Sequence, residues 1–297
     1  MKLVTNLNIF TFFIFLINII KKTYSQLSYD DETQAYWPKI CTTGTRQSPL
    51  NFVNNFSLYD SNEKIKITNA TYGNSGLVNL TLKIFNMYKF LGKFSNNMGY
   101  INVRKDNIDY QYDLVELNFH VKSEHKINNI IGDLEIQLVH KKNKEKLFAS
   151  GITVDPDSQN NYLIISTIFK TATYINTNLN TLVLGSESID LNLNPFVPVG
   201  KPFFFYEGSF TTPECEETVN WIVMQEINFI SKDQENFFNG WIAETFLAKK
   251  YNNRAVKDIG SRKVYFQYYA DQVLLNSSWN LIINLYFLVF IIGLLYA

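Results

Sequence analysis

The chain has 297 residues with 27 basic and 27 acidic side chains, so its formal net charge at pH 7 is zero. This balance gives no broad positive field, and we therefore expect no nucleic acid partner. Between two apolar ends remain about 250 residues, which is enough for one large domain with a substantial core.

Residues 1–25 have the order of a secretory signal peptide. Lys2 is followed by an apolar run over 10–20, and small residues stand at Thr23 and Ser25. The apolar run is short for a membrane span, so cleavage near Ser25 is favoured over an N-terminal membrane anchor.

Residues 271–297 form a second apolar segment, which is densest over 281–297. A hydrophobic tail preceded by the small residues at 276–278 suggests the signal for a glycosylphosphatidylinositol (GPI) anchor, and a C-terminal membrane span is the alternative. Both readings tether the protein to a membrane. We therefore expect a domain over 26–270 that enters the secretory pathway and faces outward on the cell surface.

Two cysteines, Cys41 and Cys215, are present. In an exported chain an even pair favours a structural disulfide over free thiols. Four Asn-x-Ser/Thr sequons are candidates for glycosylation and support export weakly, because such triplets also arise by chance: Asn55, Asn69, Asn79 and Asn276.

Short alternating runs dominate the middle of the chain. The segments 101–104, 114–121, 134–140 and 162–168 alternate apolar and polar residues or are rich in β-branched residues, and they predict strands. The basic run over 141–146 lies between two of these strands, so we expect a solvated hairpin loop there.

The later part of the chain is less uniform. The stretch 219–230 suits a strand and a helix equally, and both readings stay open. The stretch 235–250 has apolar residues at three- and four-residue spacing, which predicts a helix with its apolar face in the core. The fold class is therefore mainly β with a few short helices, in a single domain.

One predicted strand carries chemistry on a single face. Because side chains alternate along a strand, Glu116, Asn118 and His120 share one face, and the apolar residues between them share the other. The next strand repeats the pattern with Glu135 and Gln137. If the two strands are neighbours, they present a cluster of polar side chains over a hydrophobic core.

Five segments in these regions resemble the α-carbonic anhydrase family. Residues 118–128 (NFHVKSEHKIN) resemble its motif His-Phe-His-x-x-Ser-Glu-His-x-Ile-x, and 134–140 (LEIQLVH) resemble its Glu-x-His-x-Val-His strand. Residues 46–51 (RQSPLN), 206–215 (YEGSFTTPEC) and 253–264 follow other family signatures in the same order. The resemblance covers about 37–264, and it implies a single domain around a large twisted, mostly antiparallel sheet. It also implies a disulfide between Cys41 and Cys215.

The family binds Zn²⁺ through three histidines and leaves a fourth position for water, whose pKa the metal lowers to about 7. By the resemblance these three positions are Asn118, His120 and Gln137, so only one imidazole remains. Carboxamide oxygens are poor zinc ligands. A relocated metal site could use Glu116, but His120 would be its only strong nitrogen donor, because the resemblance gives His125 and the chain's third histidine, His140, structural roles. We therefore expect no cofactor.

Other catalytic positions of the family are partly kept. Glu124 and Thr211 match the pair that orients the zinc-bound hydroxide, and without zinc we expect them to persist as a buried hydrogen-bonded pair. Glu135 matches the acid that hydrogen-bonds the third ligand. Leu77 stands where the fastest members have a proton-shuttling histidine.

The favoured interpretation is an acatalytic carbonic-anhydrase-like module of the cell surface, with vestigial zinc positions, that binds an extracellular protein or a carbohydrate. The alternative is a zinc-dependent carbonic anhydrase of low activity, in which Asn118 and Gln137 serve as weak ligands. A third reading is a pocket that holds a small anion without turnover, since Thr211 and nearby backbone amides remain.

Overall fold

The computed structural model describes residues 29, 34, 37–53, 55, 64–73, 77–86, 89–94, 98–180, 188–197, 199–245 and 251–267. The predicted signal peptide (1–25) and the hydrophobic tail (271–297) lie outside these residues. Across the part of the chain that is described, no helix has the length and apolar character needed to cross a membrane.

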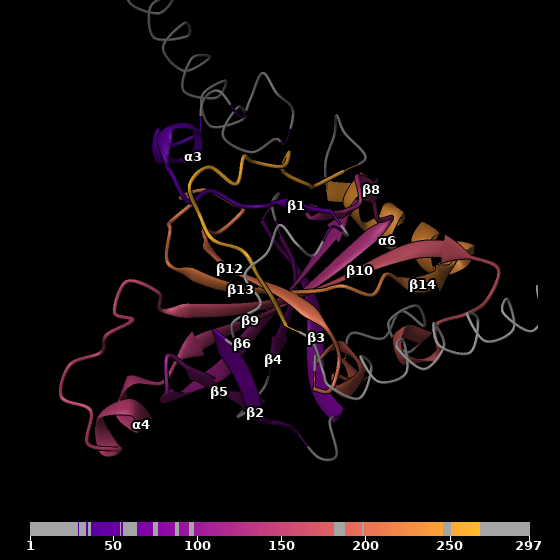
Figure 1. Cartoon of the computed structure of the whole chain (residues 1–297). Coiled ribbons are helices and arrows are strands. Elements are labelled where there is room, and N and C mark those ends of the chain that lie inside the picture. The colour runs from indigo at the N-terminus through magenta and orange to yellow at the C-terminus, as the bar shows by residue number, and fades with distance from the viewer. Residues whose placement is uncertain are drawn as a thin grey trace, which may run out of the picture.

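A twelve-stranded twisted sheet forms the body of the domain (Figure 1). Its main path is β11-β3-β4-β6-β9-β10-β13-β12-β15, while β2 joins through β5 to β6, and β14 pairs with β10. The pairs β10–β13 and β10–β14 are parallel, and the other pairs are antiparallel. The prediction of a large, mostly antiparallel sheet is confirmed. The strands of this sheet are β2 (Ile65–Tyr72), β3 (Leu77–Asn86), β4 (Lys89–Phe94), β5 (Gly99–Lys105), β6 (Ile108–Val121), β9 (Leu134–Lys142), β10 (Tyr162–Ala172), β11 (Ser188–Asn192), β12 (Phe203–Gly208), β13 (Val219–Met224), β14 (Asn228–Ser231) and β15 (Tyr265–Gln267).

The remaining elements are short. A small second sheet consists of β1 (Asn51–Phe52), β7 (Lys126–Ile127) and β8 (Ile130–Ile131). The helices are α3 (Ile40–Thr43), α4 (Lys144–Ala149) and α6 (Lys232–Thr245), with the 3₁₀ turns η2 (Thr177–Leu179) and η3 (Asn194–Phe196). The predicted helix over 235–250 is confirmed as far as Thr245, and 246–250 lie outside the described residues. The open question over 219–230 is answered by two strands, β13 and β14.

Hydrophobic residues fill both faces of the sheet, and β10 shows this directly. Leu163, Ile165 and Phe169 belong to one core cluster, whereas Ile164 and Ile168 belong to another. Alternation along the strand sends these two sets to opposite faces, so β10 is apolar almost throughout. The disulfide predicted from the resemblance, between Cys41 and Cys215, is present with an S–S distance of 2.07 Å.

The basic run over 141–146 is not the solvated hairpin loop that we predicted. Strand β9 continues to Lys142, and α4 begins at Lys144 with the Asn143 side chain accepting a hydrogen bond from the Lys146 N–H. The Lys142 side chain is fully buried, and its Nζ lies 2.9 Å from Asp155 Oδ2. A counter-charge supplied by a later loop therefore offsets the cost of burying this lysine.

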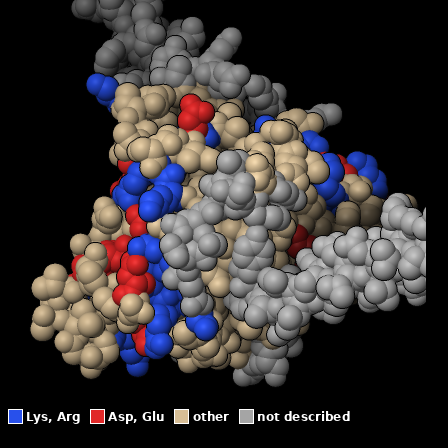
Figure 2. Space-filling model, in the orientation of Figure 1, with Lys and Arg blue, Asp and Glu red and all other residues tan. Residues whose placement is uncertain are grey.

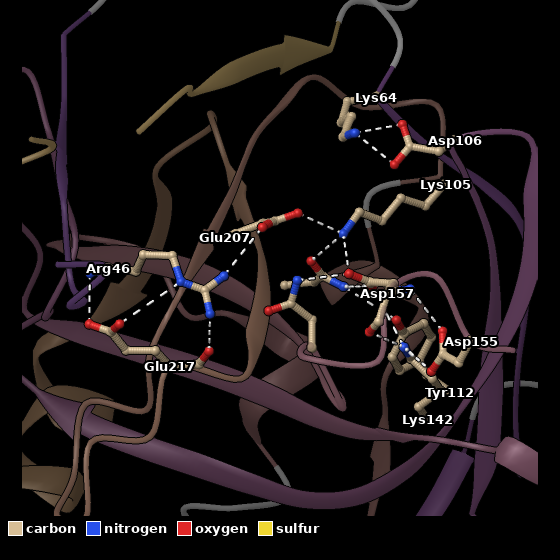
Figure 3. A network of polar contacts seen from close by, with 12 residues as sticks. Arg46, Lys64, Lys105, Asp106, Tyr112, Lys142, Asp155, Asp157, Glu207 and Glu217 are labelled. Atoms are coloured by element: carbon tan, nitrogen blue, oxygen red, sulfur yellow. Dashed lines mark hydrogen bonds and ion pairs between the residues drawn. The ribbon is translucent and has the colours of Figure 1, made fainter. Parts of the chain in front are cut away.

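A second buried lysine extends the same network toward the sheet (Figure 3). Lys105 Nζ lies 2.8 Å from both Asp157 Oδ1 and Glu207 Oε1 and 3.1 Å from Asn220 Oδ1. The Asn220 amide in turn donates to Asp157 Oδ2 at 2.9 Å. Each buried charge has partners of opposite sign, so the network fixes the 153–161 loop against β5 and β13.

The exposed charges are interleaved rather than segregated. Figure 2 shows Lys and Arg side chains alternating with Asp and Glu along one side of the molecule, without a broad area of one sign on this face. Arg104 and Asp109 form an exposed ion pair, whose Nη2 and Oδ2 atoms lie 2.7 Å apart. This pattern agrees with the balanced composition.

Candidate metal centre

The register of β6 and β9 brings the three predicted zinc positions together. Asn118 is the cross-strand partner of Gln137, and His120 is the partner of Glu135. Their side chains are almost completely buried, with exposed fractions of 4% for Asn118 and 1% for both His120 and Gln137. The structure therefore places the residues that alternation put on one face of each strand in one interior cluster.

Gln137 acts in this cluster as a hydrogen-bond donor to two carboxylates. Its Nε2 lies 2.9 Å from Glu124 Oε2 and 3.0 Å from Glu135 Oε1. Both N–H groups of the amide are thereby used. The amide nitrogen thus adds one donor to each buried carboxylate, beside the donors that Glu135 receives from Ser166, His125 and two backbone N–H groups.

His120 is held through one ring nitrogen only. Its Nδ1 lies 2.8 Å from the carbonyl oxygen of Asn252, a geometry that places the proton on Nδ1. Its Nε2 is buried and has no hydrogen-bond partner among the described residues, and the same is true of Asn118 Oδ1. The Asn118 amide nitrogen lies 3.4 Å from Glu116 Oε1.

The expected pairing of Glu124 with Thr211 is not found in the described part of the structure. Glu124 Oε1 accepts the backbone N–H of Arg254 at 3.0 Å, and Oε2 accepts from Gln137. Thr211 follows the end of β12 in the chain and is buried, with an exposed fraction of 4%. Leu77 begins β3, and its side chain lies outside the described part.

Glu135 stands at the start of a buried hydrogen-bond chain. Its Oε1 lies 2.9 Å from His125 Nδ1, and His125 Nε2 lies 2.7 Å from the Tyr206 hydroxyl, which donates to Ser48 Oγ at 2.9 Å. Burial acts to raise the pKa of Glu135, but the charge of His125 and its hydrogen bond, with smaller contributions from His120 and Gln137, lower it to about 2. Glu135 is therefore an ionised acceptor. Sequence alternation placed Glu135 correctly but gave no signal for Tyr206 and Ser48, which come from distant segments.

The third histidine lies in a separate environment. His140 Nε2 is 2.8 Å from the Tyr72 hydroxyl, and its Nδ1 faces the carbonyl oxygens of Leu138 and Leu163 at 3.1 and 3.3 Å. Burial lowers the pKa of His140 to about 4, although these carbonyls oppose the shift. His140 is therefore a neutral residue of the core at pH 7.

The donor set of the cluster does not match zinc. Structural and catalytic zinc sites use three or four strong ligands from His, Cys, Asp and Glu. Within the described residues no group of three or more such side chains is placed to hold a metal ion. The cluster offers the bare Nε2 of His120 and two carboxamides, one of which is committed to Glu124 and Glu135 through its nitrogen.

The glycosylation candidates fall in different settings. Asn55 and Asn69 are exposed, and Asn69 lies on β2 beside a bulge in its pairing with β5. Asn79 pairs with Asp190 in the β3–β11 ladder, and its side chain is not described. Asn276 lies outside the described residues.

Comparisons with known proteins agree with this architecture. Residues 32–268 match the family model of the eukaryotic-type carbonic anhydrase. Alpha carbonic anhydrase 4 of Arabidopsis thaliana is 25% identical over 240 residues, which cover 78% of each chain. The crystal structure of a halotolerant carbonic anhydrase from Dunaliella salina has a TM-score of 0.61 at 19% identity and covers 77% of this chain and 90% of that chain. The structure of dioscorin complexed with ascorbate has a TM-score of 0.59 at 22% identity, with 77% and 88% covered. The chain belongs to the carbonic anhydrase family.

Proposed function

We propose that this chain is an acatalytic member of the carbonic anhydrase family that serves as a binding module on the cell surface. The observation that carries the proposal is the Gln137 amide, whose nitrogen donates to both Glu124 and Glu135. A zinc ligand at this position would have to present a lone pair to the metal. Gln137 has only its carboxamide oxygen to offer, which is a poor zinc ligand, because its nitrogen donates to the two carboxylates.

The chemistry of CO2 hydration depends on a metal that makes bound water acidic. Loss of a single residue that hydrogen-bonds a metal ligand commonly costs about 10–100-fold in metal affinity or activity. Two of the three ligand positions are carboxamides here, so we expect a larger loss. Glu124, which would orient a zinc-bound hydroxide, is held by Gln137 and Arg254.

Two apolar segments support a place of action outside the cell. The apolar segments at 1–25 and 271–297 support export and tethering, and the disulfide of an exported chain is consistent with this. We propose an extracellular protein or a carbohydrate as partner. A relative, dioscorin, has been crystallised with ascorbate, which supports a binding role for this fold. Release from membranes by a phospholipase specific for GPI anchors would separate such an anchor from a membrane span.

Metal analysis of the purified protein tests the acatalytic role. We expect far less than one zinc per chain and CO2 hydration at the uncatalysed rate. The double variant Asn118→His/Gln137→His should bind about one zinc per chain, because it restores three imidazoles on neighbouring strands. The single variant Asn118→His is the matched control and should stay largely free of zinc. Stoichiometric zinc and sulfonamide-sensitive turnover in the unaltered protein would overturn the proposal in favour of a working carbonic anhydrase.

A further inference from the structure

Two buried acceptor atoms lie on the same face of β6 without a hydrogen-bond partner among the described residues. They are His120 Nε2 and Asn118 Oδ1, on side chains with exposed fractions of 1% and 4%. Residues two apart on a strand point to the same side of the sheet, so the two atoms belong to one locality. Buried polar atoms normally have a partner, and two adjacent orphans of the same kind therefore point to a missing donor.

The side chains of Asn118, His120 and Gln137 cannot themselves supply that donor. Both N–H groups of Gln137 go to Glu124 and Glu135, and the Asn118 amide nitrogen faces Glu116. The ring N–H of His120 is directed at the carbonyl of Asn252. The donors of the cluster are thus already engaged, and the cluster is left with free lone pairs.

The charges around the cluster favour a cation. Glu124 and Glu135 are buried carboxylates in contact with Gln137. Glu135 is compensated by His125, Ser166 and two backbone N–H groups, so the negative charge next to the cluster lies mainly on Glu124. The nearby Arg254 gives its backbone N–H to Glu124, but it directs its guanidinium to the carbonyl oxygens of Cys41 and Ser48 and to other backbone and amide oxygens. A zinc dication in this place would attract anions, whereas lone pairs backed by carboxylates attract the opposite charge.

We propose that the vestigial zinc position binds a small cationic N–H donor of the ammonium type, which donates to His120 Nε2 and Asn118 Oδ1. This inference rests on the proposed function, because zinc on His120 would occupy the same nitrogen. It also gives this position a ligand preference opposite to that of an anion site. Ammonium is close to water in size, so the site needs to hold little more than one water molecule.

Nitrogen NMR of protein with ¹⁵N-labelled histidine tests the proposal, because the chain has only three histidines. The variant His120→Phe assigns the His120 signals by their loss. Ammonium chloride should shift the Nε2 resonance of His120 saturably. Potassium chloride should leave it unchanged at equal concentration, because potassium has a similar size but donates no hydrogen bonds. Acetate and bicarbonate should also leave the resonance unchanged.

Variants at Asn118 check the second acceptor. Asn118→Leu removes the oxygen at similar size and should weaken ammonium binding about tenfold or more, as expected for a lost hydrogen bond to a charged donor. Asn118→Asp keeps an acceptor and adds negative charge, so it should tighten binding by about the same factor. The same Asn→Leu exchange at the exposed Asn180 is the control and should leave binding unchanged.

The outcomes separate the two proposals. Stoichiometric zinc in the purified protein would overturn both of them. A zinc-free protein whose His120 resonance ignores ammonium, or responds to acetate or bicarbonate, would overturn the cation site alone. If Asn118→Leu does not fold, the Asn118→Asp titration still decides, because unchanged affinity there contradicts the site.

Discussion

Replacing Gln137 with methionine should destabilise the domain strongly, although methionine is similar in size and apolar. The substitution removes the two N–H donors that lie 2.9 and 3.0 Å from Glu124 and Glu135. A hydrogen bond to a charged group contributes about 1.5–3 kcal/mol, so the two together suggest a loss of about 3–6 kcal/mol in the free energy of unfolding. At about 2–4 °C per kcal/mol for a domain of this size, the melting temperature should fall by 6 °C or more.

Urea unfolding at pH 7 measures this loss, and Gln111→Met is the matched control. Gln111 donates one N–H, at 2.7 Å, to the half-buried carboxylate of Asp113, so its loss should cost about 1 kcal/mol or less. Equal losses in the two variants would refute the role assigned to Gln137. A change below about 1 kcal/mol in Gln137→Met would refute it as well.

Gln137→Met should also change how the free energy of unfolding depends on pH in the acid range. Burial acts to raise the pKa of Glu135, but His125, His120 and Gln137 together lower it to about 2, from 4.5 in the unfolded chain. A depressed folded-state pKa contributes stability that is present above 4.5 and is lost as the pH falls toward 2. Removing the Gln137 donor moves the folded pKa upward, so the loss of stability between these pH values should become shallower.

Three further predictions concern the rest of the domain. Lys142→Met should cost about 3–5 kcal/mol in urea unfolding, because it leaves the buried Asp155 without a cation, while Asp157 keeps Lys105. The exposed Lys144→Met should stay within about 0.5 kcal/mol, and similar values for both variants would contradict the buried network. Burial lowers the pKa of His140 from 6.5 to about 4. The free energy of unfolding should therefore fall by about 3 kcal/mol as the pH drops from 6.5 to 4, because the unfolded chain binds the proton more readily. His140→Gln should lack this fall. Replacing both Cys41 and Cys215 with alanine should cost about 2–5 kcal/mol, because the bridge joins residues 174 apart in sequence, and an unchanged melting temperature in calorimetry would oppose this.

Strand positions were predictable from the sequence because they depend on a local pattern. Alternation identified the segments of β6 and β9 and placed Asn118, His120 and Gln137 on the faces that the structure brings together. The orientation of the Gln137 amide was not predictable, since it depends on Glu124, which comes from a turn after β6. The burial of Lys142 escaped prediction for the same reason, because its counter-charges come from a later loop that has no periodic pattern of its own.

The retention of one imidazole in the cluster has a structural explanation that requires no metal. Asn252 accepts the Val121 N–H at 2.7 Å and donates to the Phe119 carbonyl at 2.9 Å, and its own carbonyl meets His120 Nδ1 at 2.8 Å. These three contacts bind Asn252 to β6 on both sides of His120. They hold the His120 ring with Nε2 lacking a hydrogen-bond partner among the described residues. His120 thus has a fixed ring with one bare nitrogen, and the site lacks further imidazoles. This is why two added histidines should suffice to recover zinc, and why the unaltered cluster should favour a single small donor.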